Sequence, residues 1–356
     1  MFKKNVIALG LTALLAACTG VQTSAPVGTS QEIQAEQVRQ KSIIYSSFVE
    51  NQADLYRISL PILSSNAEFC GQNVRPITGI SAWNIYAVPE EFRAAAQAEY
   101  NLGNDLIVQN VVPNSPGARA GVRPGDILLA VNGRQIPKGA QAVQAAQEYL
   151  NASGYNSLEL SYARNGVART TSLRPVPACN YPVMLDNSSQ INAYADGEKI
   201  IVTRGMTRFT ESDTETALVV AHELAHNTMQ HIDKLKQNTM TGSLGGLVVD
   251  SLLGAAGINT GNQFSQLGGA LGQQRYSIPF EQEADYVGMY YLARAGYPVT
   301  GVADFWRRMA AEGNSSSEVR TSHPTSAERF IALERTEAEI VAKQRNGAPL
   351  VPNFTQ

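Results

Sequence analysis

The spacing of apolar residues changes twice along the chain and divides it into helical and strand-rich parts. Residues 31–64 place apolar side chains at helical intervals, and residues 276–298 do so again near the other end. Between them, residues 106–112 and 157–162 have the composition of strands, with a helical stretch at 141–150. This pattern predicts an α+β chain, in which a mainly helical domain with a small β-sheet carries an inserted β-rich domain.

A further helix is predicted where an apolar run follows a helix-start signal. Ser212 and Glu215 have the S-x-x-E spacing of a capping box, so we expect the helix to begin near Asp213. The apolar run at 217–221 leads directly into His222-Glu223-Leu224-Ala225-His226. Because neither Pro nor Gly interrupts this stretch, we expect the helix to continue through these residues to about Leu235.

The two histidines of this helix are candidate metal ligands. His222 and His226 lie four residues apart, which on a helix puts both imidazoles on one face, where they can bind a single Zn²⁺. Glu223 lies beside that face and can take a proton from the attacking water. A buried helix with two incidental histidines is the alternative. The chain has only 4 histidines in 356 residues, however, and two of them flank a glutamate at this spacing.

Zinc hydrolases usually have three protein ligands and one open position for water. A third histidine ten residues after His222 is excluded, because that residue is Ile232. His231 lies five residues after His226, and on a continuous helix it is rotated away from the ligand face. We interpret His231 as a surface or packing residue.

The predicted helix at 276–298 offers carboxylates instead. Pro279 suits its first turn, and Glu281 and Asp285 share one face, whereas Glu283 points away. Glu281 would be the third ligand, and Asp285 would hydrogen-bond the free ring nitrogen of a ligand histidine. A solvated acidic surface is the alternative interpretation of these residues.

Four ordered motifs resemble the zinc gluzincin family of the CAAX-prenyl endopeptidases and the bacterial HtpX-type membrane proteases. They are Asn192-Ala193-Tyr194-Ala195 with the following strand-like segment to Met206, the H-E-x-x-H helix, E-x-x-A-D at 281–285, and S-H-P-x-x-x-x-R at 322–329. The resemblance covers about residues 190–340. It implies a mainly helical zincin peptidase fold with a small β-sheet, one Zn²⁺ per chain, Glu281 as third ligand and Asp285 beside a ligand histidine.

The same resemblance implies that His323 and Arg329 lie near the active site. In some relatives the histidine of the S-H-P segment approaches the metal, so His323 can either cap a latent site or stabilise the oxyanion. A loop histidine before a helix is the alternative for His323. Arg329 would stabilise the oxyanion or support the metal ligands.

The segment Ser115–Gly133 closely resembles bacterial PDZ domains. Gly121 and Gly125 suit unusual backbone angles, and Asn132-Gly133 suits a hairpin turn. Such domains bind extended peptides by adding a strand to a sheet edge, and the edge here can begin at Gly79-Ile80-Ser81. The usual carboxylate-binding pattern is not clear in that segment, and a structural insert without a ligand is the alternative.

The N-terminal residues indicate export. Lys3 and Lys4 precede an apolar run, so residues 1–17 are predicted to be a signal peptide. Leu15-Ala16-Ala17-Cys18 resembles a bacterial lipobox, which implies lipidation of Cys18 and attachment to a bilayer. The residue after Cys18 is Thr19 and not Asp, and by the same resemblance this favours sorting to the periplasmic face of the outer membrane. An ordinary secreted protein is the alternative.

The two other cysteines, Cys70 and Cys179, flank the PDZ-like segment and are expected to form a disulfide in an oxidising compartment. This bond would join the two ends of an insertion. The predicted segments are a signal peptide at 1–17, a lipidated flexible tether at 18–30, an N-terminal helical part of the peptidase at 31–72, the PDZ-like domain at 73–177, the zinc metallopeptidase domain at 178–345 and a C-terminal tail at 346–356.

Net charge and the remaining composition limit the partners. The net charge is −3 and there is no basic run, so a nucleic-acid partner is not expected. The Gly-rich, apolar stretch 242–272 is interrupted by Asp250, Asn259 and Asn262 and is predicted to form two short helices beside the cleft. A dip of this stretch into the membrane is the alternative.

Together these features predict a zinc-dependent metalloendopeptidase, anchored to the outer membrane, that hydrolyses misfolded or mislocalised envelope proteins. Its substrates would be unfolded or extended polypeptides, which the strand Ile200–Thr203 would bind as an added strand. The competing hypothesis is a chaperone or assembly factor that binds its clients through the PDZ-like domain and has only latent protease activity.

Overall fold

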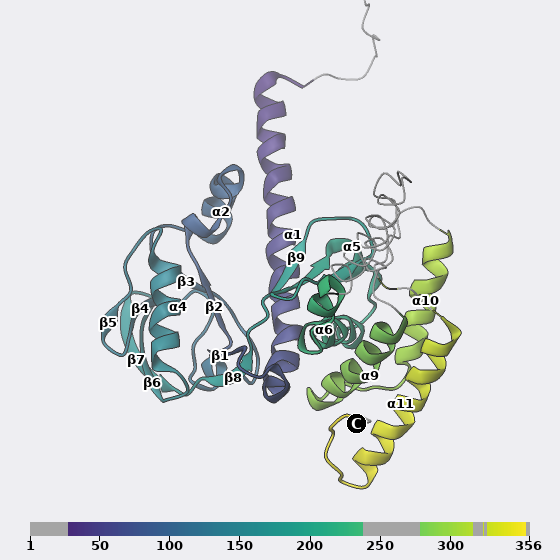
Figure 1. Cartoon of the computed structure of the whole chain (residues 1–356). Helices are drawn as coiled ribbons and strands as arrows, with labels where there is room; N and C mark the ends of the chain where they lie inside the picture. The colour runs from purple at the N-terminus through teal and green to yellow at the C-terminus, as the bar shows by residue number, and fades with distance from the viewer. Residues whose placement is uncertain (1–27, 238–277, 316–322, 324–325, 354–356) are drawn as a thin grey trace, which may run out of the picture.

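One long helix, α1 (Ser30–Ser65), stands between a strand-rich unit and a helical unit (Figure 1). The computed structural model describes residues 28–237, 278–315, 323 and 326–353. The predicted signal peptide, Cys18, most of the tether and the Gly-rich stretch 242–272 lie outside these residues. Among the helices that the structure describes, none has the length of apolar sequence that is needed to cross a bilayer.

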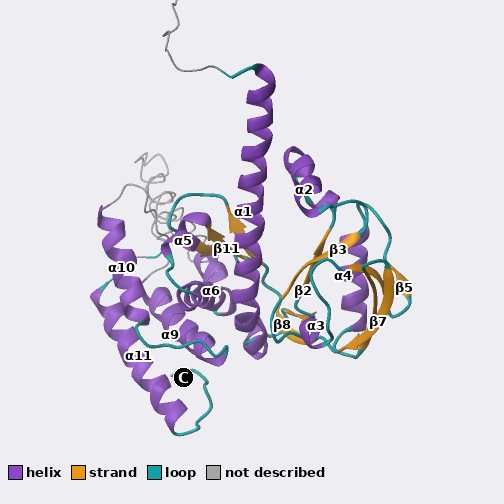
Figure 2. Ribbon diagram, turned by 180° about the vertical axis from the view of Figure 1, so that it is seen from behind, coloured by secondary structure: helices purple, strands orange, loops and turns teal. Residues whose placement is uncertain are grey.

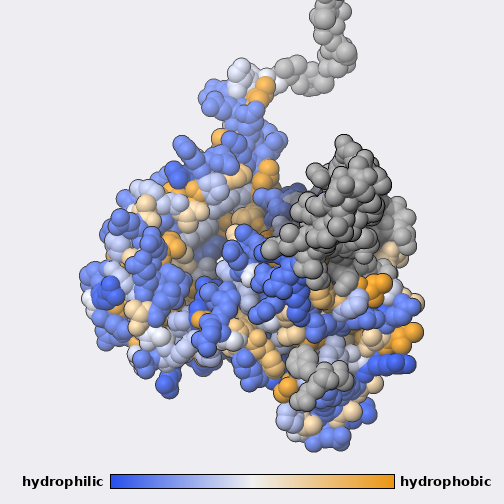
Figure 3. Space-filling view, in the orientation of Figure 1, coloured by the Kyte–Doolittle hydropathy of each residue, from blue (hydrophilic) through white to orange (hydrophobic). Residues whose placement is uncertain are grey.

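The N-terminal end of α1 extends beyond both units (Figures 1 and 2). Thr29 caps the helix, because its side chain accepts a hydrogen bond from the backbone N–H of Glu32 while the Glu32 carboxylate accepts from the N–H of Thr29. A helix of 36 residues is about 54 Å long at 1.5 Å per residue. The projecting part is mostly hydrophilic, with isolated apolar residues on its surface (Figure 3).

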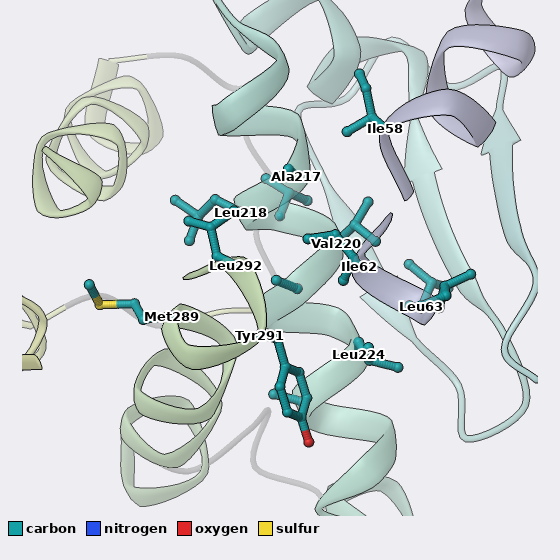
Figure 4. Close-up of a cluster of buried hydrophobic side chains, with 14 of the residues drawn as sticks. Ile58, Ile62, Leu63, Ala217, Leu218, Val220, Leu224, Met289, Tyr291 and Leu292 are labelled. Atoms are coloured by element: carbon teal, nitrogen blue, oxygen red, sulfur yellow. The ribbon is translucent and has the colours of Figure 1, made fainter. Parts of the chain in front are cut away.

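The helical unit is built around α6 (Asp213–Thr228), which packs between the C-terminal half of α1 and α9 (Figure 4). Ile62 of α1, Leu224 of α6 and Leu292 of α9 are fully buried in this core. The other helices of this unit are α5 (Arg204–Phe209), α9 (Ile278–Arg294), α10 (Val302–Ser315), α11 (Ala327–Arg345) and the 3-10 turn η1 (Ala67–Cys70).

The α6 helix begins as expected but ends early. Ser212 caps its N-terminus by accepting a hydrogen bond from the backbone N–H of Glu215. The prediction that the helix continues to about Leu235 is wrong, because α6 ends at Thr228 and Gln230 adopts a left-handed conformation with φ of 58°. A separate helical segment, 231–237, follows the break.

A three-stranded sheet lies beside α6 in the order β10-β11-β9. Its strands are β9 (Val183–Asp186), β10 (Ala193–Ala195) and β11 (Ile200–Thr203). The β11 strand pairs antiparallel with β10 and parallel with β9. The prediction that Ile200–Thr203 accepts a substrate strand is therefore wrong, since both edges of this strand already form backbone hydrogen bonds within the sheet.

The strand-rich unit contains a six-stranded antiparallel sheet in the order β2-β3-β4-β6-β7, with β5 paired to β4. Asn132 and Gly133 both have positive φ and form the expected hairpin turn between β4 and β5. The elements are β2 (Ile80–Trp83), η2 (Ile85–Ala87), η3 (Glu90–Phe92), α2 (Arg93–Tyr100), β3 (Leu106–Val111), α3 (Pro116–Arg119), β4 (Ile127–Val131), β5 (Arg134–Gln135), α4 (Ala142–Ser153), β6 (Leu158–Arg164) and β7 (Val167–Leu173).

A two-stranded antiparallel ladder joins the two units. It pairs β1 (Val74–Ile77) with β8 (Val176–Cys179), which lie at the two ends of the strand-rich unit. The disulfide expected from the sequence is present beside this ladder and links Cys70 to Cys179, with their Cα atoms 5.6 Å apart. We propose that the ladder and the disulfide together mark the two ends of the inserted domain.

The middle of α1 also packs directly against the strand-rich unit. Tyr45 stacks on Phe92, with ring centroids 5.2 Å apart, and Val49 belongs to the same buried cluster as Trp83. The side-chain amide of Asn110 donates a hydrogen bond to the carbonyl of Ala53 on α1. The long helix thus contributes to the cores of both units and holds them side by side.

Candidate metal centre and active site

Helices α6 and α9 bring three of the expected metal ligands together. The Nε2 atoms of His222 and His226 lie 3.1 Å apart. Glu281 reaches toward both of them, with Oε1 3.4 Å from His226 Nε2 and Oε2 3.5 Å from His222 Nε2. Gly288 allows this approach, because a Cβ at that position would lie 3.0 Å from the Cα of His222.

The pKa values of His226 and Glu281 suit a zinc ion, as does the placement of the whole group. Burial lowers the pKa of His226 to about 3, so its imidazole is neutral and keeps a lone pair for a metal. Burial alone would raise the pKa of Glu281, but nearby His323 and the two α6 histidines outweigh it and hold that pKa well below its usual value. Burial would lower the pKa of His222 as well, but the carboxylates of Asp285 and Glu281 outweigh it and raise that pKa. The group therefore offers a neutral imidazole at His226 and a carboxylate at Glu281, with the His222 imidazole beside two carboxylates.

Glu223 lies on the same buried face, with 1% of its surface exposed. Its Oε2 atom has no hydrogen-bond partner among the residues that the structure describes. A buried carboxylate oxygen without a partner is costly unless water or a ligand completes it. This atom is therefore suited to hold the water that a zinc peptidase activates, which is a second indication that the site fits the metal.

Asp285 and Arg329 lie behind the candidate ligands and contact them. Asp285 Oδ1 lies 3.1 Å from His222 Nδ1. The guanidinium of Arg329, which is almost fully buried, contacts both oxygens of Asp285 at 2.8 Å and Glu281 Oε2 at 2.9 Å. These contacts favour a supporting role for Arg329 over the oxyanion role that the sequence left open.

His323 enters the centre of the site instead of lying in an outer loop. Its Nδ1 is 2.9 Å from Glu281 Oε1 and 3.3 Å from His222 Nε2, while its Nε2 is 3.2 Å from Glu223 Oε1. Burial would lower the pKa of His323, but the carboxylates of Glu281 and Glu223 outweigh it and raise that pKa well above its usual value. His323 thus completes a buried group of four side chains that could hold a metal ion.

Two residues near the ligands were missed by the sequence interpretation. His231 is fully buried and its Nδ1 lies 2.9 Å from His226 Nδ1, so its interpretation as a residue rotated away from the site is wrong. The break at Gln230 is the physical reason, because it ends the helical register on which that interpretation depended. Trp306 of α10 packs against His222 with ring centroids 5.0 Å apart, and only its place in an amphipathic helix hinted at burial.

The strand-rich unit has its own apolar groove, between the outer strand β2 and helix α4. Ile80 and Ala82 of β2 face Val143, Ala146 and Leu150 of α4 across it. A second hollow continues the groove along α4 and shares Val143 with it. The expected peptide-binding edge therefore coincides with a groove that has apolar walls.

Comparisons with known proteins match two different family models to two parts of the chain. Residues 164–337 match the family model described as peptidase family M48, and residues 107–164 match the PDZ domain model. The beta-barrel assembly-enhancing protease of Yersinia pestis is 31% identical over 156 residues, which cover 39% of this chain and 31% of that protein. The mitochondrial metalloendopeptidase OMA1 of Saccharomyces cerevisiae is 30% identical over 161 residues, which cover 43% of this chain and 45% of that protein.

The similarity thus spans less than half the length of these relatives. Among solved structures, the HtrA3 PDZ domain bound to a phage-derived ligand is 25% identical, with a TM-score of 0.22, and the match covers 30% of this chain and 89% of that chain.

Proposed function

The chain carries a peptidase family M48 domain joined to a PDZ domain, and on this premise we propose that it is a zinc metalloendopeptidase that cleaves misfolded or mislocalised envelope proteins. The observation that carries the proposal is the buried group of His222, His226 and Glu281 beside the carboxylate of Glu223. A pure binding protein has no need of a general base next to three metal ligands.

Each residue of the site has a defined part in peptide hydrolysis. His222, His226 and Glu281 would hold the Zn²⁺, which supplies a Lewis acid that polarises the scissile carbonyl and lowers the pKa of water toward ~7. Glu223 takes a proton from the attacking water and delivers it to the leaving amine. Asp285 and Arg329 keep the ligand side chains in place.

A direct test uses the chain without its predicted signal peptide and an unfolded protein as substrate. We expect one zinc per chain and cleavage that stops when a chelator removes the metal and returns when zinc is restored. Cleavage that continues unchanged in metal-free protein would refute the proposal.

The competing hypothesis, a client-binding assembly factor with latent activity, is favoured by one observation. His323 contacts both Glu281 and Glu223, so it occupies the space between a metal ligand and the general base. A four-ligand site of this kind is closed, whereas catalytic zinc sites keep one position open. Both hypotheses are compatible with a protease that becomes active only when His323 moves away from the site.

The PDZ domain would supply substrate capture. We expect Val143→Asp, which places a charge on the wall of the apolar groove, to slow cleavage of an unfolded protein about tenfold, equivalent to ~1.4 kcal/mol of lost binding. Cleavage of a short peptide should change little, because the groove is separate from the zinc site. The matched control is Val167→Asp, since Val167 is exposed on β7 and does not line the groove.

Equal slowing by both substitutions would contradict a specific role of the groove. So would equal slowing of the protein and the short-peptide substrates by Val143→Asp. Rates for all four combinations, measured at substrate concentrations well below saturation, decide between these outcomes.

Attachment to the outer membrane would depend on Cys18. The lipobox-like sequence before this residue and the Ser-, Thr- and Gly-rich segment after it support the proposal. We expect the protein to incorporate radiolabelled palmitate in cells and to sediment with outer membranes. The variant Cys18→Ser should do neither, and label that persists in this variant would rule out the predicted anchor.

A further inference from the structure

His231 has no part in the hydrolytic steps described above, yet it lies directly behind a metal ligand. Its Nδ1 is 2.9 Å from His226 Nδ1, and its Nε2 is 2.7 Å from Glu283 Oε2. The ring is fully buried and stacks on Phe280, with ring centroids 4.5 Å apart and an interplanar angle of 12°. The side chains of His226, His231 and Glu283 therefore form a continuous row from the candidate ligand to a carboxylate on α9.

The break in the chain after α6 produces this row. Met229 closes the last turn of the helix, and Gln230 then adopts the left-handed conformation. The following segment starts in a new direction and carries the His231 ring back against His226. On an uninterrupted helix the two residues would lie on different faces, because a separation of five positions corresponds to a rotation of about 140°.

Proton positions along the row follow from the chemistry of imidazole. A neutral imidazole has one nitrogen that donates and one that accepts. His226 Nε2 faces His222 Nε2 and Glu281, so the proton of His226 belongs on Nδ1, where it is donated to His231 Nδ1. His231 must then carry its own proton on Nε2 and donate it to the carboxylate of Glu283.

We infer that His231 and Glu283 are positioning residues that fix the ring orientation and tautomer of His226 and thereby raise the affinity of the site for zinc. The inference rests on the proposed metal site and adds two residues to it. Partners that hold the outer nitrogen of a ligand histidine orient the ring and increase its basicity.

The two ligand histidines are consequently held in different ways. His222 meets Asp285 directly, and that carboxylate is buried and paired with Arg329. The row behind His226 ends at Glu283, whose side chain is 38% exposed and lies 3.8 Å from Lys234. Changes at the protein surface can therefore reach His226 through Glu283, whereas behind His222 both Asp285 and its partner Arg329 are buried.

The test is the zinc affinity of the chain without its predicted signal peptide, measured by competition with a chromophoric chelator. We expect His231→Phe, which keeps the stacked ring but removes both nitrogens, to weaken zinc binding about 10- to 100-fold. His231→Asn should retain most of the affinity, because its amide oxygen can accept the proton of His226 Nδ1. Glu283→Gln should give an intermediate loss, and Glu334→Gln on α11 is the exposed control.

The absorption spectrum of the Co²⁺-substituted protein gives a second readout. We expect the d–d bands to shift in His231→Phe and to return toward the wild-type positions in His231→Asn. A general loosening of the fold would lower the affinity of both variants alike, and thermal unfolding of each apoprotein identifies that case. Glu283→Gln alters a partly exposed side chain and keeps the test decisive if His231→Phe does not fold.

The outcomes separate this inference from the proposed function. If the wild-type chain binds zinc tightly and both His231→Phe and Glu283→Gln bind it equally well with unchanged Co²⁺ spectra, the positioning role is overturned while the metalloprotease remains. If the wild-type chain binds no zinc, the proposed function itself fails.

Discussion

Replacing Glu223 with Gln is expected to lower the rate of peptide hydrolysis about 10²- to 10⁴-fold, the range that general acid–base catalysis contributes. Zinc binding should not change, because Glu223 is not among the four side chains grouped around the metal position. The amide has nearly the same shape as the carboxylate but cannot accept the proton of the attacking water.

The environment of Glu223 explains why the loss should be large. Burial alone would raise its pKa, but His323 and the two ligand histidines outweigh this effect and lower the pKa, so the carboxylate is ionised and ready to act as a base. Its Oε2 atom has no other partner in the part of the chain that the structure describes. Among the described residues, the two neighbouring carboxylates have other partners, since Glu281 is a proposed metal ligand and Asp285 is held by Arg329.

The measurement compares initial rates on an unfolded protein substrate for wild type and Glu223→Gln at matched zinc occupancy. Glu211→Gln is a suitable control, because Glu211 is an exposed glutamate just before the same helix. Full activity of the Glu223 variant would show that another group acts as the base. Loss of both zinc and activity would indicate a structural defect and would call for Glu223→Asp as a second variant.

Replacing His323 with Ala is expected to increase cleavage by about 10- to 1000-fold, if the open form of the site is the kind of minor state that is populated at 0.1–10%. The imidazole of His323 lies between Glu281 and Glu223, and its removal leaves space there for water and a substrate carbonyl. A gain of activity is rare among substitutions of buried polar residues and would be strong support for a latent protease.

Ser326→Ala is the matched control for this experiment. Ser326 caps α11 just after the segment that carries His323, so its loss loosens the same region without removing the imidazole. We expect little activation from it. A fall in activity in His323→Ala would instead assign this histidine a direct part in catalysis, such as stabilisation of the oxyanion.

Features set by neighbouring residues could be predicted from local patterns, whereas distant contacts could be predicted only where the cysteine count or the family resemblance indicated them. The i, i+4 spacing of His222 and His226 puts both side chains on one face of their helix, whatever the position of that helix in the fold. Asn132-Gly133 forms its turn because of the local backbone preferences of these two residues. The α+β class and the place of the disulfide followed from similarly robust patterns. Glu281 was selected by its spacing to Asp285 together with the family resemblance.

The errors share one physical origin, because in each case the tertiary fold sets a feature that the local sequence does not encode. Gln230 takes a left-handed conformation without being Gly or Asn, so nothing in the local sequence marked the end of α6 or the return of His231 to the site. The strand Ile200–Thr203 has the right composition for an edge, but its neighbours are chosen by the tertiary fold. His323, by contrast, was expected near the active site from the family resemblance, and the packing of α11 against α9 helps to set its position there.

The narrow junction between the two units also affects how easily one domain can be inserted into the other or exchanged. In the domain division that we propose, the inserted domain lies between Cys70 and Cys179, whose Cα atoms are only 5.6 Å apart. A gap of that width is spanned by one or two residues. A domain whose termini lie close together could therefore be inserted between these residues, or removed, without changing the positions of the metal-site residues. The domain that we propose to capture clients would then be exchangeable, and grafting a different binding domain between Cys70 and Cys179 would redirect the protease to chosen targets.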